Sequence, residues 1–263
     1  MPISSFKRYE LKYLVCREQL DALLPCLLRH TEPDDYCKNG GDYPIYNVYF
    51  DTPDSALIRE SLAKPYYKEK LRLRSYSSPA KPGDRVFLEL KKKTGGIVHK
   101  RRAAMTLAES AELLAHGKTS EGSGYMNGQV TRELLYFLSL YKLNPAVYIG
   151  YRRMAFTAKC DRSLRITFDF DIVTRRRELT LERECYGRQL LNEGWYLMEI
   201  KLSGAMPAWL ASLLSEHTIH KTSFSKYGAE YKNHCLEQYA ASGGLDLSGS
   251  EAVFLHPGLC VNF

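Results

Sequence analysis

The stretch KEKLRLRS, residues 68–75, decides the fold class of this chain. Every even position carries a cation, whereas leucines occupy two of the odd positions between them. Successive side chains of a β-strand point to opposite faces, so this alternation predicts a strand with one cationic and one apolar face. The cationic face holds Lys68, Lys70, Arg72 and Arg74, and the opposite face holds Leu71 and Leu73.

The next segment continues the two-faced pattern. In residues 86–93, one face of the predicted strand carries Glu89, Lys91 and Lys93, and the opposite face carries Val86, Leu88 and Leu90. The sequence Thr94-Gly95-Gly96 then favours a turn into a second basic strand near residues 99–103. These two segments therefore predict a β-hairpin.

Other segments alternate in the same way. The first, residues 8–15, places Arg8, Glu10 and Lys12 on one face. Further strands are expected at residues 45–52, 147–156, 164–172, 178–186 and 196–202. Together these segments predict an antiparallel sheet of about eight or nine strands.

Helical signals are fewer. Thr106 and Glu109 form a capping-box pattern before an apolar-periodic stretch that ends near Gly117. Residues 17–30, 130–142 and 206–217 are the other expected helices, and residues 119–128 form a Gly/Ser-rich loop. We expect one domain over residues 1–240 and an appended C-terminal tail over residues 241–263.

Composition narrows the class of protein. A net charge of +7 favours an anionic partner, which leaves nucleic acid, an anionic membrane and a phosphorylated small molecule open. No apolar run approaches the roughly 20 residues that a membrane-spanning helix needs, and no apolar signal core opens the chain. We therefore expect a cytoplasmic protein without a membrane span. Seven scattered cysteines without a CxxC pair fit neither a disulfide framework nor a zinc site.

The shared ionic face of the strands points to a tunnel. A single polar face normally meets water, but if a sheet with several such strands closes, one face must line its interior. The apolar faces would then pack against helices outside, which predicts an α+β fold built on a closed antiparallel barrel of about eight strands. An interior rich in cations requires a bound polyanion, and acidic residues there, Glu10, Glu89 and Glu199, can hold a hard divalent cation.

Eight motifs recur in order along the chain: YELKY (9–13), VYFDTPD (48–54), KLRLRSY (70–76), FLELKKK (87–93), YRRMAF (151–156), LRITFD (164–169), MEIKL (198–202) and SFSKY (223–227). Together they resemble the VTC domain of polyphosphate polymerases, within the triphosphate tunnel metalloenzyme superfamily. The resemblance spans about residues 6–232.

The resemblance implies a role for each matching residue. Phosphate ligands in a catalytic tunnel would be Lys12, Arg72, Arg74, Lys91, Arg153, Arg165 and Lys226. Supporting substrate contacts would come from Glu10, Tyr151, Lys201 and Ser225. Glu199 resembles the metal-coordinating glutamate, which is usually associated with Mn²⁺ or Mg²⁺, although it could instead be an internal counter-ion to Lys201.

The implied activity is metal-dependent transfer of the terminal phosphoryl group of ATP to a growing polyphosphate chain. Two alternatives stay open: hydrolysis of triphosphate or polyphosphate, and polyphosphate binding without turnover. Where the wider superfamily often has Glu-x-Glu-x-Lys, this chain has Arg8-x-Glu10-x-Lys12, which weakens the case for a two-metal triphosphatase. Nucleic acid is disfavoured as a partner because the cationic faces carry only Tyr151 and Phe87 as stacking aromatics. The sequence assigns no membrane or regulatory partner.

Overall fold

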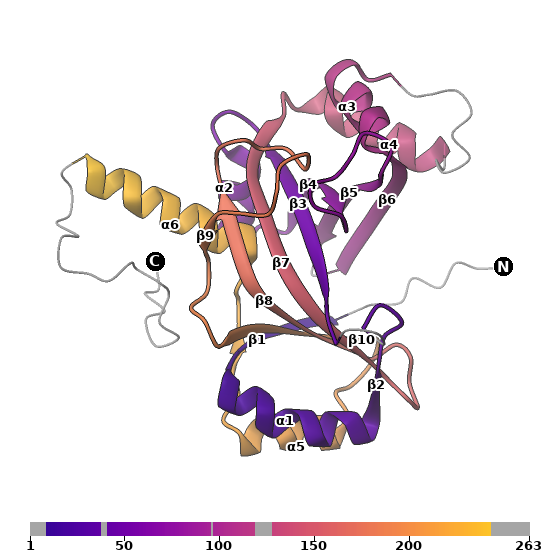
Figure 1. The fold of residues 1–263 in the computed structure, drawn as a ribbon, viewed down its shortest axis with the longest axis vertical. Helices are drawn as coiled ribbons and strands as arrows, with labels where there is room; N and C mark the ends of the chain where they lie inside the picture. Colours follow the sequence, from indigo (N-terminus) through magenta and orange to yellow (C-terminus); the bar gives the residue numbers. More distant parts are fainter. Residues whose placement is uncertain (1–8, 38–40, 96, 119–127, 243–263) are drawn as a thin grey trace. The chain divides into compact units, whose positions relative to one another are not determined.

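The computed structural model describes residues 9–37, 41–95, 97–118 and 128–242 (Figure 1). The expected tail lies outside these residues except for its first two positions, and so does most of the expected 119–128 loop. In chain order the elements are β1 (Tyr9–Cys16), α1 (Arg17–His30), β2 (Thr31–Pro33), β3 (Tyr43–Asp51), α2 (Ala56–Leu62), β4 (Tyr67–Ser75), β5 (Arg85–Thr94), β6 (Ile97–Thr106), α3 (Leu107–His116), α4 (Gly128–Leu140), β7 (Asn144–Ala158), β8 (Arg165–Arg175), β9 (Arg188–Gln189), β10 (Trp195–Leu202), α5 (Ala208–Glu216), β11 (Lys221–Thr222) and α6 (Lys226–Ala241).

Within the described residues, the sheet is antiparallel, as expected, but it has eleven strands and is not closed into a barrel. Within the described segments, the hydrogen-bonded order β11-β1-β10-β8-β7-β3-β4-β5-β6 has two ends, with β2 attached to β7 and β9 to β8. The prediction of a closed barrel of about eight strands was therefore wrong in closure and in count. Alternation shows which face of a strand is ionic, but it carries no information about pairing between the two outermost strands.

The chain forms two compact units, and strands β7 and β8 contribute residues to both. Unit 1 comprises Met1–Tyr43, Tyr151–Ile172 and Gln189–Phe263, and unit 2 comprises Pro44–Gly150 and Val173–Arg188. The expectation of one domain over residues 1–240 remains a prediction. Each unit has its own hydrophobic core.

The core of unit 1 lies between its strands and two helices, α1 and α5. Leu20, Leu23 and Leu27 of α1 recur on one helical face and are buried. They pack in one cluster with the leucines of α5 and with the apolar faces of β1, β8 and β10 (Figure 1). These strands thus bury the apolar face that their alternation predicted, and their other face is the ionic one.

The core of unit 2 is built in the same way. The apolar faces of β4 and β5, which include Leu71 and Leu88, are fully buried. They cluster with Leu113 of α3 and with Leu134 and Phe137 of α4. The four even-numbered cations of β4 consequently share the opposite face of the strand.

Local signals explain where two helices begin. The predicted capping box is confirmed at α3: the Thr106 hydroxyl accepts from Glu109 N at 3.2 Å, and Glu109 Oε2 accepts from Thr106 N at 2.8 Å. At α2, the buried Asp51 carboxylate accepts from the backbone N–H groups of Leu57 and Ile58. Asp51 of the VYFDTPD motif therefore stabilises the start of a helix that the sequence did not predict.

The strand predicted at residues 178–186 is wrong, because this segment forms bends and irregular backbone. The Arg175 guanidinium donates to the backbone carbonyls of Glu178, Thr180, Glu184 and Tyr186. Because these carbonyls all accept from one guanidinium group, they are not available for the hydrogen bonds of a strand pair. Within the described residues, all six cysteines are free. Across the same residues, no helix combines the length and the apolar composition that crossing a bilayer requires.

Candidate functional site

The ionic face of unit 1 brings together residues from three paired strands. Strand register places Glu199 of β10 directly between Lys12 of β1 and Thr167 of β8. Lys201 of β10 lies in the neighbouring row, where it faces Glu10 on β1 and Arg165 on β8. Cross-strand neighbours have Cβ atoms about 5 Å apart, so these side chains can contact one another.

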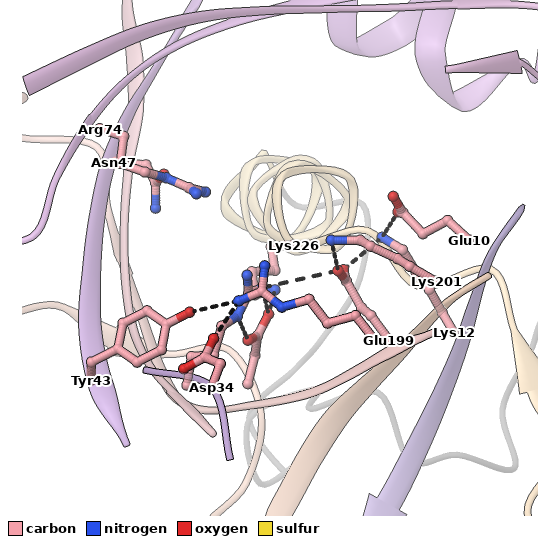
Figure 2. Close-up of polar contacts among 12 residues, drawn as sticks. Glu10, Lys12, Asp34, Tyr43, Asn47, Arg74, Glu199, Lys201 and Lys226 are labelled. Atoms are coloured by element: carbon pink, nitrogen blue, oxygen red, sulfur yellow. Dashed lines mark hydrogen bonds and ion pairs between the residues drawn. The ribbon is translucent and has the colours of Figure 1, made fainter. Parts of the chain in front are cut away.

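Glu199 is the centre of this face. Its Oε1 lies 3.2 Å from Lys12 Nζ, and its Oε2 lies 3.7 Å from Lys201 Nζ and 3.9 Å from Arg153 Nη2 (Figure 2). Burial alone would raise the pKa of Glu199, but these cations together with Lys226 hold its pKa well below the usual range. Glu199 is therefore a carboxylate, and Glu10 contacts the same Lys12 Nζ at 3.5 Å.

A second buried carboxylate, Asp169 of β8, supports the cations of unit 1. Arg153 donates to it through two nitrogens, at 2.5 Å from Nε and 2.7 Å from Nη2. Lys226, the first residue of α6, also donates to Asp169 and lies 4.4 Å from the centroid of the Tyr151 ring. Burial raises the pKa of Asp169, but Arg153 and Lys226 lower it below its ordinary value. Asp169 was not among the predicted site residues, although Asp169 and Arg165 lie on the same face of β8.

Two predicted site residues have partners of their own. Arg165 Nη2 donates to Asp34 Oδ2 at 2.6 Å and to Tyr43 Oη at 3.2 Å. Its buried Nε has no hydrogen-bond partner among the described residues, which leaves a donor for a phosphate oxygen. Ser225 is the N-cap of α6, and its hydroxyl accepts from Gly228 N at 3.4 Å. The predicted contact between Ser225 and substrate remains a prediction.

The ionic face of unit 2 centres on Glu89. Its carboxylate accepts from Arg72 Nε and Arg102 Nε, each at 2.6 Å, and pairs with Lys100 Nζ at 2.6 Å. Burial raises the pKa of Glu89, but these cations and Arg74 lower it far below its ordinary value. Glu89 is thus a counter-ion shared by these cations, and its possible role as a metal ligand remains a prediction.

Neighbouring polar residues orient the two arginines of β4. Arg72 Nη1 donates to Tyr49 Oη at 3.1 Å, and Arg74 Nε donates to Asn47 Oδ1 at 3.0 Å. Both partners lie on β3, directly opposite the arginine that each contacts. The predicted ligand Lys91 lies between Lys70 and Lys100 in the adjacent row.

The face as a whole is strongly cationic. Along β4, β5 and β6, strand register places nine cations and one carboxylate, Glu89, on this side. The nine are Lys68, Lys70, Arg72, Arg74, Arg85, Lys91, Lys93, Lys100 and Arg102. Like charges at this density repel one another, and a bound polyanion would relieve that repulsion.

Comparison with known proteins identifies the family. The model of the VTC domain matches residues 7–234, which is most of the chain. The chain therefore belongs to the VTC domain family, as the motifs indicated. No curated protein sequence matches it.

Solved structures resemble this chain at low sequence identity. A candidate adenylate cyclase from Bacillus halodurans is 15% identical over 83% of this chain and 95% of its own, with a TM-score of 0.50. A second candidate adenylate cyclase, from Vibrio parahaemolyticus, is 14% identical over 87% of this chain and 99% of its own, with a TM-score of 0.45. A protein from Pyrococcus horikoshii is 13% identical over 88% and 99%, with a TM-score of 0.42. Only the first likeness supports a shared fold.

Proposed function

We propose that this protein is a polyphosphate polymerase, which transfers the terminal phosphoryl group of ATP to the end of a polyphosphate chain. The observation that carries this proposal is the length of the cationic face in unit 2. Cations recur at every second residue of β4 from Lys68 to Arg74, and Arg85 of β5 adds a further row. At about 3.3 Å per residue, these rows extend over roughly 26 Å, which is longer than a triphosphate. A face of this length favours a polymeric ligand over inorganic triphosphate.

Unit 1 supplies the groups suited to the transferring phosphates. Lys12 and Lys201 are point charges, and Arg153 adds the charge of a guanidinium group whose Nε and Nη2 are held by Asp169. In the transfer, an oxygen of the acceptor's terminal phosphate bonds to the γ-phosphorus, and the bond between that phosphorus and ADP breaks. The protein would accelerate this step by aligning the two phosphates and neutralising their charge.

The acidic residues of unit 1 fit a divalent ion that is shared with phosphate. Among the described residues, no three His, Cys, Asp or Glu side chains form a metal-binding group by themselves. Glu199 and Glu10 nevertheless border the same ammonium group, that of Lys12, and Mg²⁺ commonly takes one or two carboxylates together with substrate phosphates. Glu199 and Glu10 would hold Mn²⁺ or Mg²⁺, and the bound ion would neutralise charge on the phosphoryl group.

Product analysis tests the proposal directly. Purified protein is incubated with ATP and Mn²⁺, and the phosphate products are resolved by gel electrophoresis. A ladder of chains with ADP is expected. Free phosphate with ADP and no chains would instead identify a hydrolase, and the absence of turnover despite binding would identify a polyphosphate-binding protein. Arg72→Gln, which removes a charge from the unit 2 face, should shorten or abolish the ladder.

Binding can be measured separately from turnover. A ligand that binds only the folded state stabilises it by about 2.7 kcal/mol at a hundredfold excess over its Kd. Triphosphate and short polyphosphate should therefore raise the Tm more than phosphate or AMP does. Equal shifts for all four ligands would contradict a site for phosphate chains.

A further inference from the structure

Thr167 has an unsatisfied hydroxyl beside the centre of the unit 1 face. It lies on β8 directly opposite Glu199 and is fully buried. Its Oγ1 has no hydrogen-bond partner among the described residues. Thr31, an equally buried threonine of the same unit, shows the usual arrangement, because its hydroxyl donates to Leu27 O at 2.7 Å. Buried hydroxyl groups without a partner are uncommon, so that of Thr167 requires an explanation.

The contacts of Glu199 suggest the missing acceptor. In the ligand-free protein, the cations Lys12, Lys201 and Arg153 surround the Glu199 carboxylate at 3.2 to 3.9 Å. These same cations are the proposed phosphate ligands. When a phosphate chain binds, its oxygens compete for them, and Glu199 would be left as a buried carboxylate with fewer partners. Such a carboxylate is unfavourable unless another donor replaces them.

Thr167 is suited to replace them. Its hydroxyl is uncharged, so a phosphate chain attracts it much less than it attracts the lysines. A hydrogen bond from Thr167 to one carboxylate oxygen would also leave lone pairs of Glu199 available to a metal ion. In metal sites, hydrogen bonds of this kind orient the ligand, and their loss typically weakens metal affinity about 10- to 100-fold.

We propose that Thr167 is a positioning residue, whose hydroxyl donates to Glu199 when phosphate is bound and orients this carboxylate toward the divalent ion. The inference rests on the proposed function, since it requires a phosphate ligand and a metal at the unit 1 face. It assigns the LRITFD motif a task that its one cation, Arg165, does not perform. In the free protein the hydroxyl contributes no hydrogen bond and can be removed without loss.

Three single variants test this role. Thr167→Val replaces the hydroxyl with a methyl group of similar shape, Thr167→Ser keeps the hydroxyl, and Thr31→Val is the matched control. For each protein we would measure the Tm without ligand and the Kd for Mn²⁺ in the presence of triphosphate, using electron paramagnetic resonance of free Mn²⁺. Thr167→Val should keep or raise the ligand-free Tm and weaken Mn²⁺ binding about tenfold or more. Thr31→Val should lower the Tm and leave Mn²⁺ affinity unchanged.

The serine variant separates positioning from packing. Thr167→Ser should retain Mn²⁺ affinity within about threefold of the wild type, because it keeps the donor. Wild-type affinity in Thr167→Val, or an equal loss in the valine and serine variants, would overturn the proposal. Failure of the proposed function gives a different result: triphosphate would then leave the Tm of the wild-type protein unchanged.

Discussion

Lys12 and Glu199 face each other across the β1–β10 pair, and their side chains meet at 3.2 Å between Nζ and Oε1. The carboxylate is buried, whereas the lysine side chain retains 22% exposure. The pair thus joins a fixed anion to a cation that can still reach a ligand from solvent. This arrangement makes Glu199 the most informative residue to change.

Glu199→Gln should lower the rate of phosphoryl transfer by about 100-fold or more while the protein stays folded. Glutamine keeps the shape of the side chain but removes the charge that would hold the divalent ion. Steady-state turnover with ATP at saturating Mn²⁺ measures the effect, and circular dichroism checks the fold. Full activity in this variant would contradict the metal role of Glu199.

Lys201→Met is the matched comparison for Glu199→Gln. Lys201 contacts the same carboxylate, at 3.7 Å, and its side chain is 34% exposed. Its loss should weaken triphosphate binding about 3- to 10-fold and reduce turnover less than Glu199→Gln does. If Glu199 and Lys201 form only a structural ion pair, both variants should instead lose stability by similar amounts and keep their activity.

Glu89→Gln should lower the free energy of unfolding by roughly 3 kcal/mol at pH 7, because several cations of the unit 2 face lose their shared counter-ion. Saturating triphosphate should restore part of this loss by supplying negative charge to the same face. Chemical denaturation with and without triphosphate measures both effects. An undiminished stability in the variant would show that Glu89 does not hold these cations together.

Glu89 also predicts the response of the fold to acid. Its pKa is lower in the folded state than in the unfolded state, so its stabilisation is complete above an unfolded pKa of about 4.3. This contribution then decreases as the pH falls toward the folded value. Between about pH 4 and pH 2, the stability of Glu89→Gln should therefore fall less steeply with acid than that of the wild type.

Lys100 should make triphosphate binding dependent on pH near neutrality. Removal from water and the nearby charges of Arg72 and Arg102 outweigh the attraction of Glu89 and lower the pKa of Lys100 to about 7. The ammonium form, which attracts phosphate, is complete below this pH and is lost as the pH rises through it. Calorimetric titration from pH 6 to 8.5 should show affinity decreasing with pH. In Lys100→Met this decrease should be smaller, and an identical profile would exclude Lys100 as a contributor.

Lys70→Gln should discriminate between long and short phosphate chains. Lys70 lies in the lysine row with Lys91 and Lys100, one row beyond Arg72 and Glu89. We expect affinity for long polyphosphate to fall about 3- to 10-fold and affinity for triphosphate to change less. The control is Lys92→Gln, since Lys92 lies on the opposite face of β5 and pairs with Glu69 at 3.4 Å. Equal effects of the two variants would mean that only net charge matters.

Alternation predicted the longer strands because each buries one apolar face in a core. No alternation can be recognised in β2, β9 and β11, because these strands have only two or three residues. The 178–186 segment looked like a strand, yet Arg175 draws its carbonyls into bends through contacts that no sequence period encodes. The sequence pattern did not predict helix α6, because the polar residues of this helix are distributed around nearly its whole circumference.

The candidate site was predicted in part for the same reason. The alternation of side chains along each strand placed Lys12, Glu199 and Lys201 on the ionic face, and the structure brings these three together. Alternation within strands could not show that Asp169 pairs with both Arg153 and Lys226, because Lys226 comes from a helix distant in sequence. It also could not separate Glu199, which borders Glu10 and Lys12, from Glu89, which the arginines of unit 2 surround. The convergence of the two ionic faces on one lumen remains a prediction.

Unit 1 is built from stretches that lie far apart in the sequence. This arrangement determines the order in which the two units can fold during synthesis on the ribosome. Strand β1 pairs with β10, so Tyr9 cannot pair until Leu202 has been synthesised. Most of unit 2, by contrast, comes from the continuous stretch Pro44–Gly150. Domains generally fold as units during synthesis, and pairings distant in sequence form slowly. On the nascent chain, unit 2 should therefore acquire protease resistance first, while the N-terminal strand with Lys12 remains unpaired until synthesis has passed β10.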